Sequence, residues 1–336
     1  MSRKAVEGIA AVVLIALAGF GAWYLLNPQI ADSGTLEPIA IRTTDQGLAG
    51  LIFIAQDGGI FSRNGLNTSI FYCDTGLACV QGMAEGEAEI AASSEYPVVG
   101  MVLKQENISV ICSIDKYLGQ YIVGRKDHGI DRVPDLRGKK IGVARGTITE
   151  FYLGRFLYLN NISLNDVTLV NVQPSQFADS IGSGSVDAIL VPQDYLNPVE
   201  ERLGGSNAVV WQAQSNQNAF GVLTCRNDWI SSHSGTINRL LTSLVEAENY
   251  ALSHPIESKA ILQRRLNYTE EYMATIWPLH QYSLTLDQSM ITAMEDEGRW
   301  MIDNNLTDER QLPNFLDSVH EDGLKAVKPE AVSIIR

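Results

Sequence analysis

The longest hydrophobic stretch of the chain lies at its N-terminus. Arg3 and Lys4 precede an apolar run from residue 5 to residue 26 that only Glu7 interrupts. The last 18 residues of this run carry no charge, which is close to the length that a helix needs to cross a bilayer. Basic residues before such a helix stay on the cytoplasmic side. The pattern therefore predicts a transmembrane helix, with everything after residue 28 outside the cell membrane.

A second interpretation of this stretch is a signal peptide that is cut after Ala18, where small residues gather. The apolar run continues for eight residues past that point, which favours an uncleaved signal anchor over residues 1–28. Residues 29–37 are small and polar, as is typical of a tether.

From residue 38 onward, short apolar stretches alternate between the spacing of a strand and the spacing of a helix. This alternation occurs twice, and it is typical of mostly parallel sheets whose faces are covered by helices. After residue 234 the spacing is almost wholly helical. The predicted strands are 38–42, 66–72, 89–92, 140–143, 167–172 and 186–191, and the predicted helices between them are 48–56, 77–85, 151–159 and 176–181.

The repeated rhythm predicts an α/β protein with two lobes, and a chain of 336 residues is long enough for both. Two extended stretches, 120–123 and 220–225, are expected to be the crossing strands between the lobes. The first lobe would contain residues 38–122 and 220–336, and the second lobe residues 123–219.

The acidic composition narrows the possible functions. The formal net charge is -14, whereas a surface that binds nucleic acid needs clustered basic residues, so we expect no nucleic-acid partner. The sequence contains no phosphate-binding loop, no G-x-S-x-G motif and no H-E-x-x-H motif. Its five histidines are scattered, mostly beside polar residues, and we expect them to be surface or boundary residues that catalyse no reaction. These features argue against an enzyme, a cofactor and a metal site.

The cysteines and the sequons agree with an exported chain. The spacing of the four cysteines fits no zinc or redox motif. Cys73 and Cys79 could form a disulfide in an oxidising compartment, with two buried thiols as the alternative. Five Asn-x-Ser/Thr sequons permit glycosylation outside the cell.

Three polar loops follow predicted strands, at the edge where open α/β sheets bind ligands. They are residues 43–47, 93–97 and 145–149. In the third loop, Gly146 allows a close backbone approach, and Thr147 opens a helix whose free N–H groups favour an anion. Thr147 or Thr149 could instead only cap that helix, and both interpretations stay open.

Several stretches together resemble the type II periplasmic binding proteins of the nitrate, sulfonate and taurine group, which are related to thiamine-pyrimidine-precursor binding proteins. The resemblance covers about residues 38–330. The stretches that carry it are residues 54–66, 83–90, 135–143, 146–147 and 184–188.

This resemblance implies two lobes with two crossing strands that close on a small anionic solute, such as a sulfonate, taurine or nitrate. It also implies delivery of that solute to the permease and ATPase subunits of an ABC transporter, and we expect a monomer. Carried over position by position, the implied ligand contacts are Gln46, Ser93, Ser94, Tyr96, Gly146, Thr147 and Thr149.

The chain departs from the group's pattern in two loops. Residues 94–97 stand where a Gly-Asp-x-Pro run is usual, and residues 192–195 stand where many members have an aromatic–acid–Pro–Tyr run. An acid in the second run can bind a ligand amine. Gln193 weakens a taurine interpretation, although Asp194 could substitute.

Two other functions stay open at this point. One is a thiamine-pyrimidine-precursor binding protein or a related pyrimidine synthase, and a synthase would need reactive His and Cys residues in the cleft. The other is an anchored ligand sensor, which would require a signalling partner.

Overall fold

The computed structural model describes residues 35–336. The signal anchor predicted over residues 1–28 and the tether up to residue 34 lie outside the described residues. Among residues 35–336, none of the helices combines the length and the apolar character that crossing a membrane requires.

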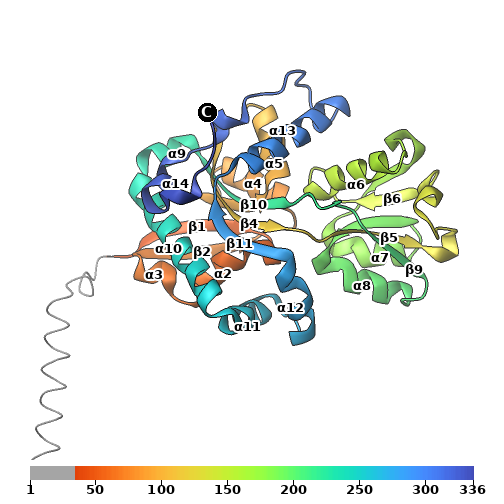
Figure 1. The fold of residues 1–336 in the computed structure, drawn as a ribbon, viewed down its shortest axis with the longest axis horizontal. Helices are drawn as coiled ribbons and strands as arrows, with labels where there is room; N and C mark the ends of the chain where they lie inside the picture. Colours follow the sequence, from red (N-terminus) through yellow and green to blue (C-terminus); the bar gives the residue numbers. More distant parts are fainter. Residues whose placement is uncertain (1–34) are drawn as a thin grey trace, which may run out of the picture. The chain divides into compact units, whose positions relative to one another are not determined.

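The first half of the fold is built on a six-stranded sheet (Figure 1). β1 pairs in parallel with β2 and β3, whereas β10 runs antiparallel to β3 and β4, and β11 antiparallel to β4. Nearly every residue of β3 and β4 is buried, as expected for strands covered on both faces. In spatial order the strands are β11 (His280–Thr285), β4 (Ile108–Tyr117), β10 (Ala219–Arg226), β3 (Ile90–Ser94), β1 (Glu37–Thr43) and β2 (Leu66–Tyr72).

The second half is built on a five-stranded sheet. β6 pairs in parallel with β7 and β8, and β5 runs antiparallel to β8 and β9. In spatial order the strands are β7 (Thr168–Asn171), β6 (Lys140–Val143), β8 (Ala188–Pro192), β5 (Gln120–Arg125) and β9 (Ala208–Gln212).

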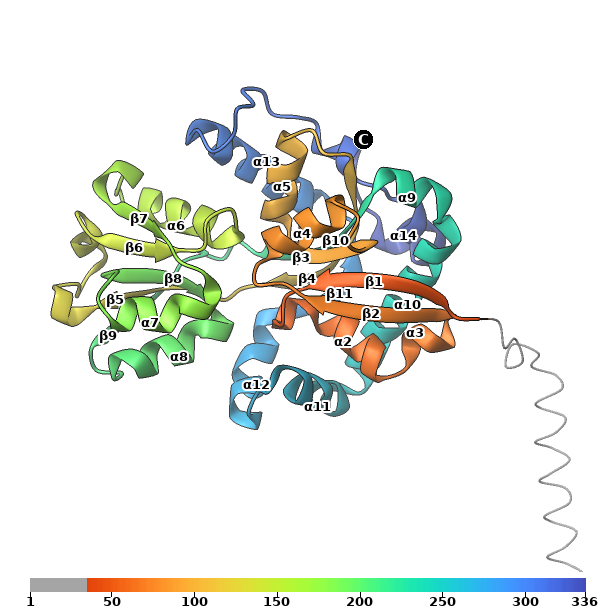
Figure 2. The ribbon, with the colours of Figure 1, turned by 180° about the vertical axis from the view of Figure 1, so that it is seen from behind.

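Helices cover both faces of each sheet (Figure 2). In the first half, α4 (Gly76–Ala84), α5 (Glu95–Leu103) and α13 (Gln288–Asp303) lie on one face. The opposite face carries α2 (Gly50–Asp57), α3 (Ile60–Arg63), α10 (Ser234–Ser253) and α11 (Pro255–Leu266). In the second half, α6 (Ile148–Leu159) lies on one face of the sheet, and α7 (Phe177–Gly182) and α8 (Gln193–Leu203) lie on the opposite face. The remaining helices are α9 (Asn227–Ser232), α12 (Glu270–Ile276) and α14 (Asp322–Val327).

The chain passes twice between the sheets, through residues 118–119 and residues 213–218. The buried side chain of Gln214 holds the two passages together. Its Oε1 accepts from the backbone N–H groups of Gly119 (2.5 Å) and Gln120 (3.0 Å), and its Nε2 donates to the carbonyl of Tyr117 (3.2 Å).

The predicted strand–helix rhythm is confirmed, but the two extended stretches that were expected to cross between lobes lie inside the sheets. Residues 120–123 belong to β5 and residues 220–225 to β10. Ile122, Val123 and the apolar side chains of 220–225 are buried in the sheets, and the passages are the short segments next to these strands. The structure also contains β11 in the region where only helices were predicted.

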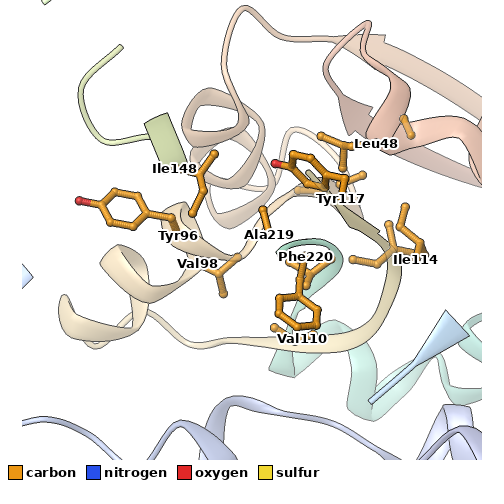
Figure 3. Packing of buried hydrophobic residues seen from close by; sticks show 14 of the residues in the cluster. Leu48, Tyr96, Val98, Val110, Ile114, Tyr117, Ile148, Ala219 and Phe220 are labelled. Atoms are coloured by element: carbon orange, nitrogen blue, oxygen red, sulfur yellow. The ribbon is translucent and has the colours of Figure 1, made fainter. Parts of the chain in front are cut away.

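The main hydrophobic core extends from the first sheet into the second half. It includes Ile148 of α6 together with Tyr96 of α5 and Tyr117 of β4. Figure 3 shows these side chains gathered near Ala219 and Phe220, where β10 begins. A smaller core fills the face of the second sheet around Phe177. The two halves are therefore packed against each other within one unit, residues 37–336.

Candidate functional site

A cavity lies between the two sheets, beside the first passage, residues 118–119. It contains about 720 Å³ of empty space, part of which is open to solvent. Its wall includes residues that follow β1, β3, β6 and β8, so it lies where α/β sheets commonly bind ligands. The starts of α4 and α6 also reach it, through Gly76 and Ile148.

The structure brings five of the eight predicted ligand contacts to this cavity. They are Gln46, Ser94, Thr147, Thr149 and Asp194. Gln46 comes from the first half and donates from Nε2 to the hydroxyl of Tyr195 in the second half, at 3.4 Å. Whether these residues contact a ligand stays a prediction.

The other three predicted contacts do not line the cavity. Ser93 is buried and donates its hydroxyl to the carbonyl of Ser94 (2.8 Å). Tyr96 is buried against the rings of Phe151 and Trp300. Gly146 donates its N–H to a carboxylate oxygen of the following helix, so that amide already has a partner.

The two threonines at the start of α6 form a compact hydroxyl pair. Their Oγ1 atoms lie 2.7 Å apart, and the carbonyl of Ala144 lies 2.7 Å from the Thr147 hydroxyl and 3.2 Å from the Thr149 hydroxyl. The capping interpretation does not fit Thr147, because its side chain makes no capping bond to the helix. The interpretation as ligand contacts stays a prediction. One of the two hydroxyl protons must lie between the threonines, so at most one can be donated to a ligand.

Two buried polar atoms at the cavity wall have no hydrogen-bond partner among the described residues. They are the hydroxyl of Thr44, which follows β1, and Oε1 of Gln120, at the start of β5. The side chains are 3% and 1% exposed. An unpaired buried polar group costs about 1–3 kcal/mol, so such groups are expected where a bound molecule supplies the missing partner.

Asp194 joins the two halves. Its carboxylate accepts a hydrogen bond from the hydroxyl of Tyr268, and the backbone of Gly47 stabilises its charged form. Burial nevertheless raises the pKa of this carboxyl above its ordinary value. The predicted role of Asp194 as a partner for a ligand amine thus competes with contacts that the protein itself supplies.

His280 lines the same cavity, a boundary position between the interior and the cavity space. Its side chain is 6% exposed, and its Nδ1 lies 2.6 Å from a carboxylate oxygen of the buried Asp115. Burial lowers the pKa of His280, but the charge of Asp115 and its hydrogen bond raise it by more, so the net pKa lies above the ordinary value. Sequence reasoning missed this pair because 165 positions separate its members.

The charges at the cavity decide which donors an anion would meet. No lysine or arginine is among the described residues that line it, whereas Asp74 and Asp194 are. The available donors are the neutral hydroxyls and amides, the positive ends of α4 and α6, and His280.

The described cysteines are all thiols, so the predicted Cys73–Cys79 disulfide is not formed in this structure and stays a prediction. Within residues 35–336, no group of three or more potential metal ligands is close enough to hold a metal ion.

A family model described as "NMT1/THI5 like" matches residues 49–258. A protein of Bacillus subtilis (strain 168), provisionally named an aliphatic sulfonates-binding protein, is 26% identical over 256 residues, which are 75% of each chain. The taurine-binding periplasmic protein of Escherichia coli (strain K12) is 25% identical over 209 residues, which are 60% of this chain and 63% of that one.

The fold is also that of solved binding proteins. The alkanesulfonate-binding protein SsuA from Xanthomonas axonopodis pv. citri, whose structure was solved with bound MOPS, superposes with a TM-score of 0.75 at 13% identity. The match covers 86% of this chain and all of that one. At this identity, the likeness shows the shared α/β periplasmic binding protein fold alone.

Proposed function

The chain belongs to the NMT1/THI5-like family, and from this premise we propose that it is the solute-binding component of an ABC importer. The solute is a small anionic compound of the sulfonate or taurine kind, as in the named relatives. The observation that carries the proposal is the cavity between the sheets, where the buried Thr44 and Gln120 offer polar atoms that no described residue satisfies.

Each half supplies part of the proposed binding set. Thr44, Gln46 and Ser94 come from the first half, and the threonine pair at α6 comes from the second. A solute that touches both groups binds the closed arrangement better than an open one, so its binding shifts the equilibrium toward closure. His280 adds a donor whose charge is held by Asp115.

We divide the two lobes at the passages, residues 118–119 and 213–218, because strands of different sheets begin on either side of them. Closure then turns about these two short segments, which the Gln214 side chain links. ABC permease and ATPase subunits are the proposed partners, with one copy of the chain as the binding unit.

The cavity supports capture of a solute better than catalysis. Its wall contains one histidine, held by Asp115, and no cysteine among the described residues, whereas a pyrimidine synthase on this fold would need both as reactive groups. We therefore propose that the chain is not an enzyme.

The apolar run of residues 5–26 supports an anchor that holds the binding domain at the outer face of the cell membrane. Fractionation of cells that express the full chain tests this proposal. The chain should sediment with membranes and resist high salt, and its mass should include residues 1–28. A soluble product whose mass begins after Ala18 would show the cleaved signal peptide instead.

A thermal-shift screen of the purified full chain tests the proposed ligand class. The panel contains taurine, ethanesulfonate, nitrate, a phosphonate and an aminopyrimidine. A ligand at 100 times its Kd stabilises the folded state by about 2.7 kcal/mol, so a sulfonate should raise the Tm by several degrees. A rise with the aminopyrimidine alone would favour the pyrimidine-precursor alternative. No shift with any compound would contradict the proposal.

A further inference from the structure

Two cysteines lie at the ends of a loop that forms part of the cavity wall. Cys73 follows β2 directly, and Cys79 lies in the first turn of α4. Between them, residues 74–76 line the cavity. The Cys73 sulfur lies within interaction distance of the Cys79 thiol, which is fully buried, whereas Cys73 is half-buried.

The backbone holds both ends of this loop in place. The N–H of Cys73 donates to the carbonyl of Thr43 (2.9 Å), and the N–H of Cys79 donates to the carbonyl of Thr75 (3.1 Å). The Thr75 hydroxyl also accepts from the N–H of Ala78 (3.1 Å) and caps α4. Regular structure thus fixes the backbone at both cysteines, and the Cys79 side chain acts as a hydrogen-bond partner of Cys73.

A guanidinium lies beside the pair. Arg42, on the neighbouring strand β1, packs so closely on α4 that a Cβ atom at Gly82 would come within 2.6 Å of its Cζ. The hydrogen bond from Cys79 and the charge of Arg42 lower the pKa of Cys73 to about 7, against the opposing effects of burial and of Asp74. Burial raises the pKa of Cys79. The accessible sulfur is therefore the better nucleophile, and the buried one is placed to resolve it.

We propose that Cys73 and Cys79 are a disulfide-forming pair that fastens the cavity loop to helix α4. The oxidant is an external disulfide, either a small molecule or a protein. The Cys73 thiolate attacks one sulfur of that disulfide and releases the other as a thiolate. The Cys79 sulfur then attacks Cys73 in the mixed disulfide and expels the second thiolate, which takes up the proton of Cys79. Two cysteine thiols are oxidised, and one external disulfide is reduced to two thiols.

This modification would act on the loop and not on the core. It closes a short ring that contains residues 74–78 and restricts the unfolded chain, so the oxidised form should unfold at a higher temperature than the reduced form. The other two cysteines, Cys112 in β4 and Cys225 in β10, are fully buried within the first sheet, and they provide the internal comparison.

The test uses the purified full chain, equilibrated with oxidised glutathione or with reductant and then alkylated in denaturant. The oxidised wild type should show two alkylated thiols, a mass lower by two hydrogen atoms and a peptide that links Cys73 to Cys79. The reductant should lower its Tm by several degrees, and it should leave the Tm of Cys73→Ser unchanged. Cys225→Ala, the matched control, should keep both the link and the response to reductant.

Four alkylated thiols in the oxidised wild type would overturn the proposal, and so would a linked peptide that contains Cys112 or Cys225. An equal effect of reductant on the wild type and on Cys73→Ser would also overturn it. The mass and the thiol count are read on the wild type, so they decide the matter even where a variant folds poorly. None of these measurements requires a solute, so their outcome is independent of the proposed transport function.

Discussion

Glu95 and Glu297 are two carboxyl groups buried side by side where the halves meet. Both are fully buried, and Glu95 accepts a hydrogen bond from the N–H of Phe220 (3.1 Å) at the start of β10. Burial raises the pKa of Glu95 to about 8 and raises that of Glu297 as well, with the charge of Glu95 as a further cause. The folded protein therefore keeps a proton on this pair that the unfolded chain releases.

This pair predicts that stability decreases as the pH rises. Between about 4.5, the ordinary value for Glu, and about 8, the folded state binds more protons than the unfolded state. The free energy of unfolding should fall across this window by up to about 1.4 kcal/mol for each unit of pH. Glu95→Gln should reduce the dependence, because an amide can accept from Phe220 without titrating, while burial still raises the pKa of Glu297. Urea denaturation at a series of pH values measures the effect.

The control for this experiment is Glu106→Gln, which removes a carboxyl group from an exposed position. It should keep the slope of the wild type. If Glu95→Gln and Glu106→Gln show the same dependence on pH, the buried pair does not hold the proton.

At the scale of elements, the loop before α6 and the start of α4 fit closely across the boundary between the halves. Gly146 has a φ of +72°, and a Cβ atom there would lie 2.7 Å from Cδ2 of Leu77. Gly204, at the end of α8, has a similar φ of +75°, but a Cβ atom there would meet no other atom within 4 Å. Both glycines thus have a left-handed backbone conformation, but only at Gly146 would an added Cβ atom collide with a neighbouring side chain.

The comparison predicts unequal costs for the same substitution. Gly204→Ala should lose about 1–2 kcal/mol, from the left-handed backbone alone. Gly146→Ala should lose clearly more, because the added methyl group also pushes Leu77 away. Leu77→Ala should cost less in the Gly146→Ala background than in the wild type. Urea denaturation of the wild type, Gly146→Ala, Leu77→Ala and the double variant provides the double-mutant cycle. If the losses of stability from Gly146→Ala and Leu77→Ala are additive, the two positions are not coupled and the expected steric contact is absent.

The elements could be predicted where their own residues determine them. Most of the strands and helices from residue 38 to residue 191 follow from apolar spacing, since alternation and helical periodicity are local features. Two elements of this range, α5 and β4, were not predicted. β11 was missed because it is an edge strand of only six residues between helices, and His280, Gln281, Ser283 and Thr285 are polar. It forms a strand because it pairs with β4, a tertiary contact that its own sequence does not predict.

The candidate site could also be predicted only in part from the sequence. The loops after the strands could be predicted, and they brought Gln46, Ser94 and the threonine pair to the cavity. The sequence could not predict which side chains of these loops face the cavity, because neighbouring residues at a strand end point to opposite sides. Ser93 and Thr43 are turned into the protein, whereas Ser94 and Thr44 line the cavity. His280 needed the tertiary contact with Asp115 to be recognised.

At the scale of the whole molecule, the proposed transport function places the bound solute in the space between the two sheets. Contacts from both halves already close around it, including Gln46 with Tyr195 and Tyr272 with the carbonyl of Gln193 (2.7 Å). Apolar packing of α6 against the first half also holds the halves together. A bound solute that contacts both halves adds its own binding free energy to this closed arrangement. The buried polar atoms at the wall lower the stability of the empty form and favour the loaded one.

Isothermal titration calorimetry on Thr44→Val and Thr43→Val, with the panel compound that shifts the Tm most, tests this claim most directly. Both changes remove a buried hydroxyl with little change in shape, but Thr43 donates to the carbonyl of Thr44 (3.3 Å), whereas the Thr44 hydroxyl has no partner among the described residues.

Thr44→Val should weaken binding by about 1 kcal/mol or more, and it should leave the stability of the empty protein unchanged or higher. Thr43→Val should lower that stability by about 1 kcal/mol and keep the affinity of the wild type. An affinity that Thr44→Val leaves intact would contradict the claim that the solute binds between the sheets.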